Sequence, residues 1–156
     1  MKRLLLLFML LPSLSNAACF DKVGAKYRLD PDYLRAIAFK ESKYRPKSIG
    51  KNNDGSIDVG IMQINSSNIE WLKRKFPDIS IRRLLVDNCY NIQVGGYILN
   101  ENFKIYGRSW LAVGVYNAGG KNNPKRVKIR YAYAKEVNKY YNQIKQGKLR
   151  LPKIKS

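Results

Sequence analysis

The sequence predicts an α+β domain that is predominantly α-helical and carries one small β-hairpin. Helices are predicted because apolar residues recur at spacings of three and four, in segments separated by caps, prolines and glycines. The hairpin is predicted because residues 47–65 are polar and contain Asn52-Asn53-Asp54-Gly55, a strong turn signal. The length of 156 residues fits one such domain with its own core.

Two helices are predicted before the hairpin. Apolar residues at helical spacing indicate a short helix at about 20–27. A second helix is expected at about 31–44, because Asp30-Pro31 has the pattern of an N-cap followed by proline at the first helical position. One arm of the hairpin is then expected at 56–60.

Four more helices are predicted after the hairpin. The apolar spacing places them at about 66–76, 88–106, 110–116 and 127–144. Their boundaries are set by residues that cap or break helices: Asn65 or Ser66, Pro77, Asp87, Gly107, Ser109 and the run 117–120.

The domain is expected at 18–144, with separate segments at both ends. Residues 1–17 have the features of a secretory signal peptide: a basic start, an apolar run and small residues before the cleavage point. The alternative is a membrane anchor, but the apolar run is shorter than the roughly 20 residues of a spanning helix. We therefore expect an exported protein with no stable membrane span after cleavage. The tail 145–156 is basic and is expected to be loose.

Cys19 and Cys89 are the two cysteines of the sequence. Both belong to the mature chain, and export leads to an oxidising compartment. We therefore predict a disulfide between them, which would contribute roughly 4 kcal/mol in the chain-entropy model. Two separate buried thiols are the alternative.

The net charge of +19 indicates an anionic partner. Removing Lys2 and Arg3 with the signal peptide leaves +17. Nucleic acid, an anionic membrane and an anionic cell wall all fit this charge, but export argues against nucleic acid. Solubility alone is the remaining explanation.

The composition excludes several kinds of chemistry. The sequence has no histidine, which removes Ser-His-Asp and Cys-His pairs and the commonest metal ligand. No glycine-rich phosphate loop occurs. Neither a metal nor a cofactor is predicted, and carboxylates are the best remaining acid–base groups.

Glu41 is the carboxylate best placed for such a role. Leu34, Ile37 and Ala38 precede it by seven, four and three residues, so all four share one helix face. Partial burial and the negative end of the helix dipole should both raise its pKa, as a general acid requires near neutral pH. The alternative is a surface glutamate paired with a neighbouring cation.

Four segments follow one another in the order Lys40-Glu41-Ser42, Gly60-Ile61-Met62-Gln63-Ile64-Asn65, Tyr116-Asn117-Ala118-Gly119 and Tyr133-Ala134-Lys135-Glu136-Val137. Together they resemble the Glu-Ser, Gly-x-Met-Gln-x-Asn, Tyr-Asn-Ala-Gly and Tyr-x-x-x-Val segments of lysozyme-like lytic transglycosylases. The likeness spans about Cys19 to Tyr141. It implies a lysozyme-like fold in which the hairpin follows the catalytic helix and a cleft lies between them.

The small size, the signal peptide and the cysteine pair narrow the resemblance further. They are similar to features of the specialised transglycosylases that accompany type III secretion, type IV secretion and pilus machines. Residues 49–58 are most similar to those of the invasion and type III secretion group. The resemblance thus implies a role in virulence and a secretion or pilus component as partner.

The resemblance also implies the reaction. The substrate would be peptidoglycan, cleaved between N-acetylmuramic acid and N-acetylglucosamine without water. Glu41 would protonate the leaving glycosidic oxygen and then act as base on the sugar's own 6-hydroxyl, which attacks C1. The product would carry a 1,6-anhydromuramoyl end. The substrate's acetamido group can stabilise the transition state, so a second carboxylate is not required.

The matching segments supply candidate substrate-binding residues. Amide groups suit the neutral N-acetyl groups of the glycan, and a tyrosine ring offers a flat face to a pyranose. The candidates are Ser42, Met62, Gln63, Asn65, Tyr116, Asn117 and Tyr133. Tyr133 is also a candidate hydrogen-bond partner of Glu41. The alternatives are a helix-end role for Ser42, simple core for Met62 and helix packing for Tyr133.

Asp58 is a second candidate catalytic residue. It lies on the hairpin arm expected to face Glu41, two residues before Gly60. There it resembles the second carboxylate of animal-type lysozymes, which would stabilise the oxocarbenium ion. The alternative is a hairpin residue that bonds its own backbone.

Two other functions compete with a periplasmic lytic transglycosylase that opens the wall locally for a secretion or pilus apparatus. A true lysozyme would use water and leave reducing ends. An exported basic binding module would dock on the wall or on a secretion component, and Glu41 would be dispensable. A nucleic-acid-binding protein is disfavoured by the signal peptide.

Overall fold

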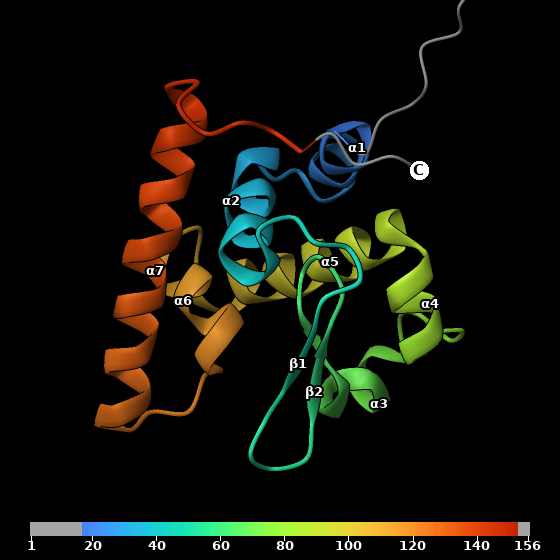
Figure 1. The fold of residues 1–156 in the computed structure, drawn as a ribbon. Coiled ribbons are helices and arrows are strands. Elements are labelled where there is room, and N and C mark those ends of the chain that lie inside the picture. Colours follow the sequence, from blue (N-terminus) through green and yellow to red (C-terminus); the bar gives the residue numbers. More distant parts are fainter. Residues whose placement is uncertain (1–16, 153–156) are drawn as a thin grey trace, which may run out of the picture.

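The computed structural model describes residues 17–152 and confirms a mostly helical fold with one small antiparallel sheet (Figure 1). Residues 1–16 of the predicted signal peptide lie outside this range. The elements are α1 (Ala17–Tyr27), α2 (Pro31–Ser42), β1 (Ile49–Lys51), β2 (Ile57–Val59), β3 (Ile64–Asn65), the 3-10 turn η1 (Ser66–Asn68), α3 (Ile69–Leu72), α4 (Ile81–Val86), α5 (Asn88–Tyr106), α6 (Trp110–Ala118) and α7 (Pro124–Lys145). Within residues 17–152, no helix combines the length and the apolar character that a membrane crossing requires.

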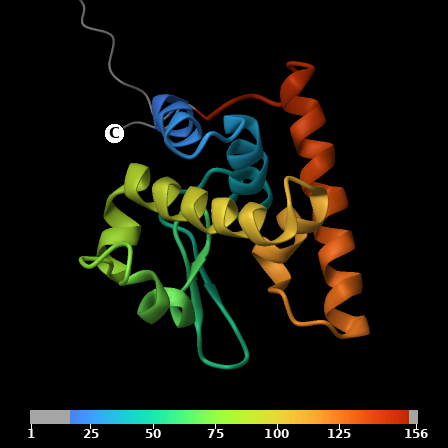
Figure 2. The ribbon, with the colours of Figure 1, turned by 180° about the vertical axis from the view of Figure 1, so that it is seen from behind.

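Helix α5 runs through the centre of the molecule, as the view from behind shows (Figure 2). Helices α1 and α6 pack against it, and α7 packs against α2 and α6. In both views the strands β1 and β2 lie between α3 on one side and α6 and α7 on the other. Leu34, Ile92 and Leu99 are fully buried in the core between these helices.

Two consecutive glycines allow other parts of the chain to contact α5 closely. A Cβ on Gly95 would lie 2.8 Å from Cε of Met62, and one on Gly96 would lie 2.4 Å from Cγ1 of Val23. Both distances are too short for a real side chain, so only glycine permits this approach. The segment after β2 and helix α1 are therefore seated directly on α5.

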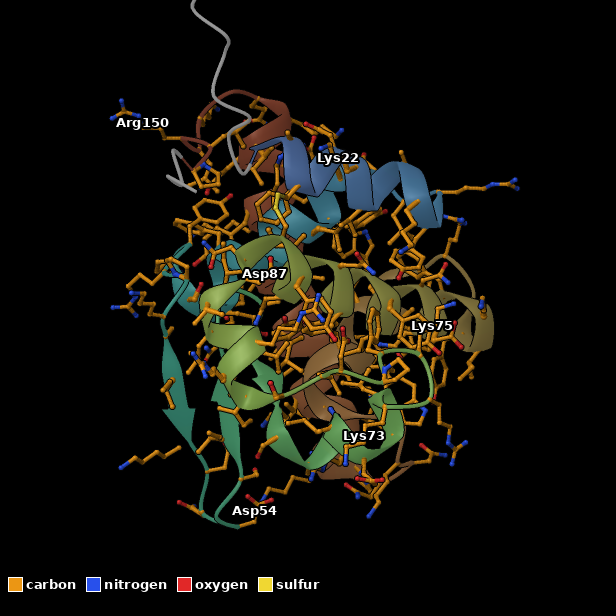
Figure 3. The ribbon with its side chains drawn as sticks, turned by 90° about the vertical axis from the view of Figure 1, so that its right-hand side faces the viewer. Lys22, Asp54, Lys73, Lys75, Asp87 and Arg150 are labelled. Carbon is orange, nitrogen blue, oxygen red and sulfur yellow. A yellow bond between two sulfur atoms is a disulfide. The ribbon has the colours of Figure 1, made fainter. Side chains whose placement is uncertain are left out.

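The predicted hairpin is present and gains a third strand. The order is β1-β2-β3, with Gly50 opposite Asp58 and Asp58 opposite Asn65. Asp54, at the tip of the hairpin (Figure 3), accepts hydrogen bonds from the backbone and hydroxyl of Ser56. The third strand was not predicted because two residues are too few to show an alternating pattern.

Helix α2 ends at Ser42 and not at Tyr44 as predicted. Lys43 and Tyr44 have φ values of 53° and 61°, so the chain leaves the helix in left-handed conformations. The amide of Lys43 still donates a hydrogen bond to the carbonyl of Phe39, which closes the last turn. Glu41 and Ser42 are therefore the last two residues of α2.

The region between the sheet and α5 also differs from the prediction. The helix expected at 66–76 is reduced to η1 and α3, which ends at Leu72. The predicted cap is present, since the side chain of Asn65 accepts from the amide of Ser67, but the turn that it caps is 3-10. Helix α4 was not predicted. Its signal in the sequence was Ser80, whose hydroxyl accepts from the amide of Arg83, followed by an apolar pattern only six residues long.

The C-terminal helices are longer than predicted, and the tail is partly ordered. Helix α6 continues to Ala118, and α7 begins at Pro124 after the cap Asn123. Lys145 forms ion pairs with Asp30 (2.9 Å) and Asp32 (2.8 Å) at the start of α2. Leu149 packs against the core. The expectation of a loose tail is therefore wrong for residues 145–149.

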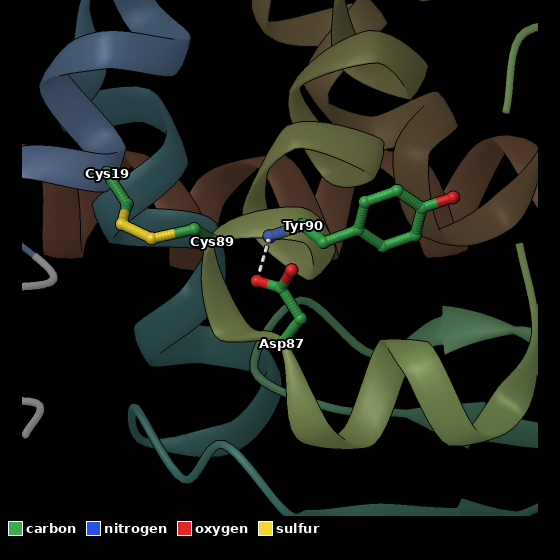
Figure 4. The surroundings of a disulfide bond; sticks show 4 residues. All are labelled: Cys19, Asp87, Cys89 and Tyr90. Carbon is green, nitrogen blue, oxygen red and sulfur yellow. Dashed lines mark hydrogen bonds between the residues drawn. A yellow bond between two sulfur atoms is a disulfide. The ribbon is translucent and has the colours of Figure 1, made fainter. Parts of the chain in front are cut away.

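The predicted disulfide between Cys19 and Cys89 is confirmed (Figure 4). It joins α1 to the first turn of α5 across a Cα–Cα distance of 5.4 Å. Asp87 caps the same end of α5, as predicted, by accepting a hydrogen bond of 2.9 Å from the amide of Tyr90. The N-terminal helix is thus held on the central helix by a covalent bond.

Candidate active site

Glu41 lies in the last turn of α2, where the helix meets a large cavity. Leu34, Ile37 and Ala38 on the same face are fully buried, as the periodicity predicted. The carboxyl group sits at the edge of this core, partly buried, and lines a cavity of about 870 Å³. The chain therefore holds this acid half out of water while leaving it accessible from a cleft.

This environment changes the proton affinity of Glu41. Burial raises the pKa of Glu41 from 4.5 to about 7. The hydroxyl of Tyr133 donates a hydrogen bond to Oε1 and limits the rise, whereas the negative charge of Asp58 increases it. With a pKa near 7, both the acid and the carboxylate are well populated at neutral pH, so this group can donate a proton and later accept one.

Tyr133 reaches Glu41 from α7, which confirms the predicted hydrogen bond between them. Only 5% of Tyr133 is exposed, and burial together with the nearby Glu41 raises the pKa of its hydroxyl well above the usual value. The phenol therefore stays protonated and acts as a donor. An ion pair between Lys40 and Glu136 (2.5 Å) joins the same two helices beside this contact.

Asp58 lines the same cavity from β2. Its Oδ1 accepts a hydrogen bond from Asn65 Nδ2 (2.9 Å), and its Oδ2 accepts one from Asn52 Nδ2 (3.0 Å). Two amide donors suit a carboxylate, which can only accept hydrogen bonds. The structure thus brings the two candidate catalytic carboxyl groups, Glu41 and Asp58, together on one cavity.

Gln63 and Asn65 also line the cavity, but their amide groups are used within the protein. Gln63 Nε2 donates to the carbonyls of Ser48 (3.1 Å) and Gly60 (2.8 Å), and the residue has a left-handed φ of 49°. Asn65 donates to Asp58 and accepts from Ser67. Both residues therefore hold the sheet side of the cavity in shape.

Ser42 and Met62 do not line the cavity. Ser42 is 1% exposed, and its hydroxyl donates to the carbonyl of Ile61 at 2.8 Å, which ties the end of α2 to the segment after β2. Met62 is fully buried against Gly95 of α5. The structure gives these two residues positions in the core, where neither can touch a sugar directly.

Asn91 of α5 is a positioning residue that the sequence reasoning missed. It is fully buried, and its amide donates to the carbonyls of Val59 (2.9 Å) and Leu84 (3.0 Å) and accepts from the amide of Met62 (2.9 Å). It thus fixes the segment between β2 and β3 on the central helix. A polar residue within the apolar pattern of the longest helix was its signal.

Tyr116 and Asn117 reach the cavity from the end of α6. The hydroxyl of Tyr116 donates to the carbonyl of Met62 at 2.9 Å, so this ring bridges α6 and the sheet segment. Asn117 is exposed and available for polar contacts.

The cavity continues well beyond these residues. One part is lined by Trp71 of α3 and by α5, and another by Lys121 of the loop before α7 and Arg126 of its first turn. None of these was predicted as a site residue, because none belongs to the four matching segments. Among residues 17–152, no group of three His, Cys, Asp or Glu side chains could hold a metal ion.

Comparisons with known proteins agree with this geometry. The family described as "Transglycosylase SLT domain" matches residues 18–140. The invasion protein IagB of Salmonella typhi is 44% identical over 130 residues, which cover 83% of this chain and 79% of that protein. Protein IpgF of Shigella flexneri is 38% identical over 139 residues, which cover 89% of both chains.

Two solved structures share the fold. The 70 kDa soluble lytic transglycosylase of Escherichia coli has a TM-score of 0.65 and 23% identity, over 86% of this chain. Lytic transglycosylase Slt of Pseudomonas aeruginosa has a TM-score of 0.64 and 21% identity, over 88% of this chain. The chain spans 25% of each of these longer proteins. The predicted lysozyme-like architecture and the predicted family are both confirmed, and the chain belongs to the transglycosylase SLT domain family of peptidoglycan lytic transglycosylases.

Proposed function

We propose that this lytic transglycosylase cleaves the β-1,4 bond between N-acetylmuramic acid and N-acetylglucosamine, with Glu41 as acid and then as base. The observation that carries the proposal is the environment of Glu41. Burial and the Tyr133 hydrogen bond leave its pKa at about 7, on a cavity large enough for several sugar rings. A carboxyl group with this pKa can both give and take a proton at neutral pH.

The proposed reaction conserves one proton on Glu41. The protonated carboxyl gives its proton to the glycosidic oxygen as the bond from that oxygen to C1 of N-acetylmuramic acid breaks. The resulting carboxylate removes the proton from the 6-hydroxyl of the same sugar, and O6 bonds to C1. Glu41 is then protonated again, and the product ends in a 1,6-anhydromuramoyl group.

The positive charge that develops at C1 needs a stabilising neighbour. The acetamido group of the substrate can supply it, and Asp58 is the protein group suited to assist. Its two oxygens are fixed by Asn52 and Asn65, so it faces the cavity in one orientation. We propose an electrostatic role for Asp58, secondary to the role of Glu41.

The remaining predicted residues divide into two proposed roles. Tyr116 and Asn117 line the cavity and are proposed to contact the sugars directly. Gln63 and Asn65 shape the sheet side of the cavity, and Ser42 and Met62 hold that side on α2 and α5. Tyr133 orients the carboxyl group of Glu41.

We further propose that the enzyme works in the periplasm and opens the wall locally for a secretion or pilus apparatus. The signal-like segment at 1–17 and the disulfide between Cys19 and Cys89 support export to an oxidising compartment. One relative that is 44% identical is named an invasion protein. The net charge of +17 that remains without residues 1–17 (19 − 2, for Lys2 and Arg3) favours encounter with the anionic wall.

Mass spectrometry of digested peptidoglycan tests the reaction. Purified wild-type protein is expected to release muropeptides with anhydro ends, which lack one water relative to the products of a lysozyme. The Glu41→Gln variant serves as the matched control and is expected to release none. Reducing ends from the wild-type protein would instead establish hydrolysis, and full activity of the variant would defeat the assignment of Glu41.

A further inference from the structure

We propose that Trp71 forms a second saccharide-binding subsite, on the α3 side of the cleft, for an N-acetylated sugar of the glycan strand away from the bond that is cleaved. The inference rests on the proposed function for the identity of the polymer. Glu41 meets Tyr133 of α7, whereas Trp71 belongs to α3, and the hairpin lies between these two helices (Figures 1 and 2). One cavity is nevertheless lined by both Glu41 and Trp71.

Trp71 is exposed in a way that fits a binding platform. The side chain has 40% of its surface exposed, and it lines the cavity. Lys73, which directly follows α3, is labelled in Figure 3 and shows where this helix ends. A large aromatic ring left open to water on the wall of a cleft is a typical mark of a ligand site.

The indole is held in place from behind. Tyr97 of α5 stacks on it with ring centroids 5.7 Å apart and an interplanar angle of 26°. Tyr97 is supported in turn by the edge contact with Phe76 (5.5 Å) and by the tilted contact with Tyr27 (6.2 Å). One face of Trp71 is thus covered by protein, and its orientation is fixed before any ligand arrives, which reduces the entropy lost on binding.

The surroundings of Trp71 select a neutral, partly apolar ligand. The cavity residues nearest to it in the chain and on the facing part of α5 carry no charge: Ser67, Asn68, Ile98, Asn102 and Ile105. The C–H face of a pyranose ring packs well on an indole, and asparagine amides suit hydroxyl and acetamido groups. By contrast, Lys121 and Arg126 make the other end of the cavity cationic.

A subsite of this kind binds polymer without taking part in bond cleavage. Its loss should therefore weaken binding of long strands and leave the rate of the bound complex unchanged. The Trp71→Ala variant is expected to raise KM for long glycan strands by about tenfold with kcat within twofold of wild type. The KM of Trp71→Phe, which keeps an aromatic ring, is expected to lie between those of wild type and Trp71→Ala.

One control variant separates this effect from the loss of any exposed aromatic ring. Tyr131→Ala removes an aromatic side chain that is 69% exposed on α7 and does not line the cavity. It is expected to leave KM unchanged. An equal KM for Trp71→Ala and wild type, or a fall in kcat with no change in KM, would overturn the proposal.

A binding measurement tests the subsite independently of catalysis. The tryptophan fluorescence of Glu41→Gln is compared with that of Glu41→Gln/Trp71→Phe during titration with long, undigested glycan strands, and the difference isolates Trp71 from Trp110. A saturable change in this difference supports the subsite even if Glu41 were not the acid. No change at strand concentrations that saturate the wild-type enzyme contradicts it.

Discussion

The two candidate catalytic carboxyl groups lie on one cavity but in contrasting regions of the molecule. Glu41 comes from the helical region, where α2 and α7 pack together and remove water from its side chain. Asp58 comes from the sheet, where amide groups of Asn52 and Asn65 satisfy both of its oxygens. Apolar packing surrounds the first group, and polar hydrogen bonding surrounds the second.

This difference in environment gives two carboxyl groups different proposed roles. Burial penalises the charged form of Glu41, so the helical region supplies a proton donor near neutral pH. The sheet instead presents fixed negative charge to the cavity and, through that charge, raises the pKa of Glu41 further. Each variant below changes one side of this comparison and leaves the other in place.

The largest effect is expected from removing the proton of Glu41. Glu41→Gln keeps the size of the side chain and an oxygen that can accept from Tyr133, but it cannot transfer a proton. Because general acid catalysis contributes up to about 10⁴-fold, release of muropeptides should fall by roughly 10³-fold or more. Chromatography of digested peptidoglycan measures the rate, and an unchanged circular dichroism spectrum is the control for folding.

The same variant should be more stable than wild type at alkaline pH. The folded pKa of Glu41, about 7, lies above its ordinary value of 4.5, so the folded state holds the proton more tightly. The stability from this protonation is complete below pH 4.5, declines as the pH rises toward 7 and is lost above it. The shift corresponds to roughly 3 kcal/mol of unfolding free energy.

Denaturant unfolding at two pH values checks this sign. Glu41→Gln does not titrate, so it should exceed wild type by up to roughly 3 kcal/mol at pH 8 and equal it near pH 4. Equal stability at both values would contradict the burial of Glu41 as the cause of its raised pKa. The comparison needs no substrate, so it examines the helical region alone.

Asp58→Asn changes the sheet side and should have a smaller effect on rate. The loss of negative charge at the cavity is expected to lower kcat by about tenfold, because one electrostatic contact to the transition state is lost. It should also lower the pKa of Glu41, since the charge of Asp58 raises it. The alkaline limb of the pH–rate profile, near pH 7 in wild type, should therefore move to lower pH. An alkaline limb that stays near pH 7 would show that the charge of Asp58 does not affect the pKa of Glu41.

The positions of these residues show what the sequence could predict. Glu41 was found by periodicity, because three buried apolar residues and a cap fix which face of α2 meets the core. The hairpin was found from its turn signal, and Asp58 from its position on that hairpin. The disulfide followed from there being two cysteines in a chain expected to be exported.

Other features depend on contacts between distant parts of the chain, which no local pattern reports. Asn91 is fully buried yet polar, and its role emerges only when Val59, Met62 and Leu84 surround it. Met62 was a candidate sugar contact because of its motif, but its side chain packs against Gly95 and is buried in the core. Trp71 lies on the short α3, and its contact with Tyr97 of α5 joins residues 26 positions apart, so no local pattern singled it out.

The smallest effect on rate is expected from Tyr133→Phe. This variant is informative because of the direction in which it should shift the pKa of Glu41. The hydrogen bond from Tyr133 stabilises the charged form of Glu41, so its loss should raise the pKa of Glu41 above about 7. The alkaline limb should then move to higher pH, opposite to the shift expected for Asp58→Asn, while kcat falls only a few-fold because the carboxyl group is less well oriented. The control Tyr131→Phe removes a hydroxyl from the same helix at a site that is 69% exposed. It should change neither kcat nor the position of the alkaline limb. A shift in the same direction for Tyr133→Phe and Asp58→Asn would mean that the two sides of the cleft act on Glu41 through its position and not through its charge.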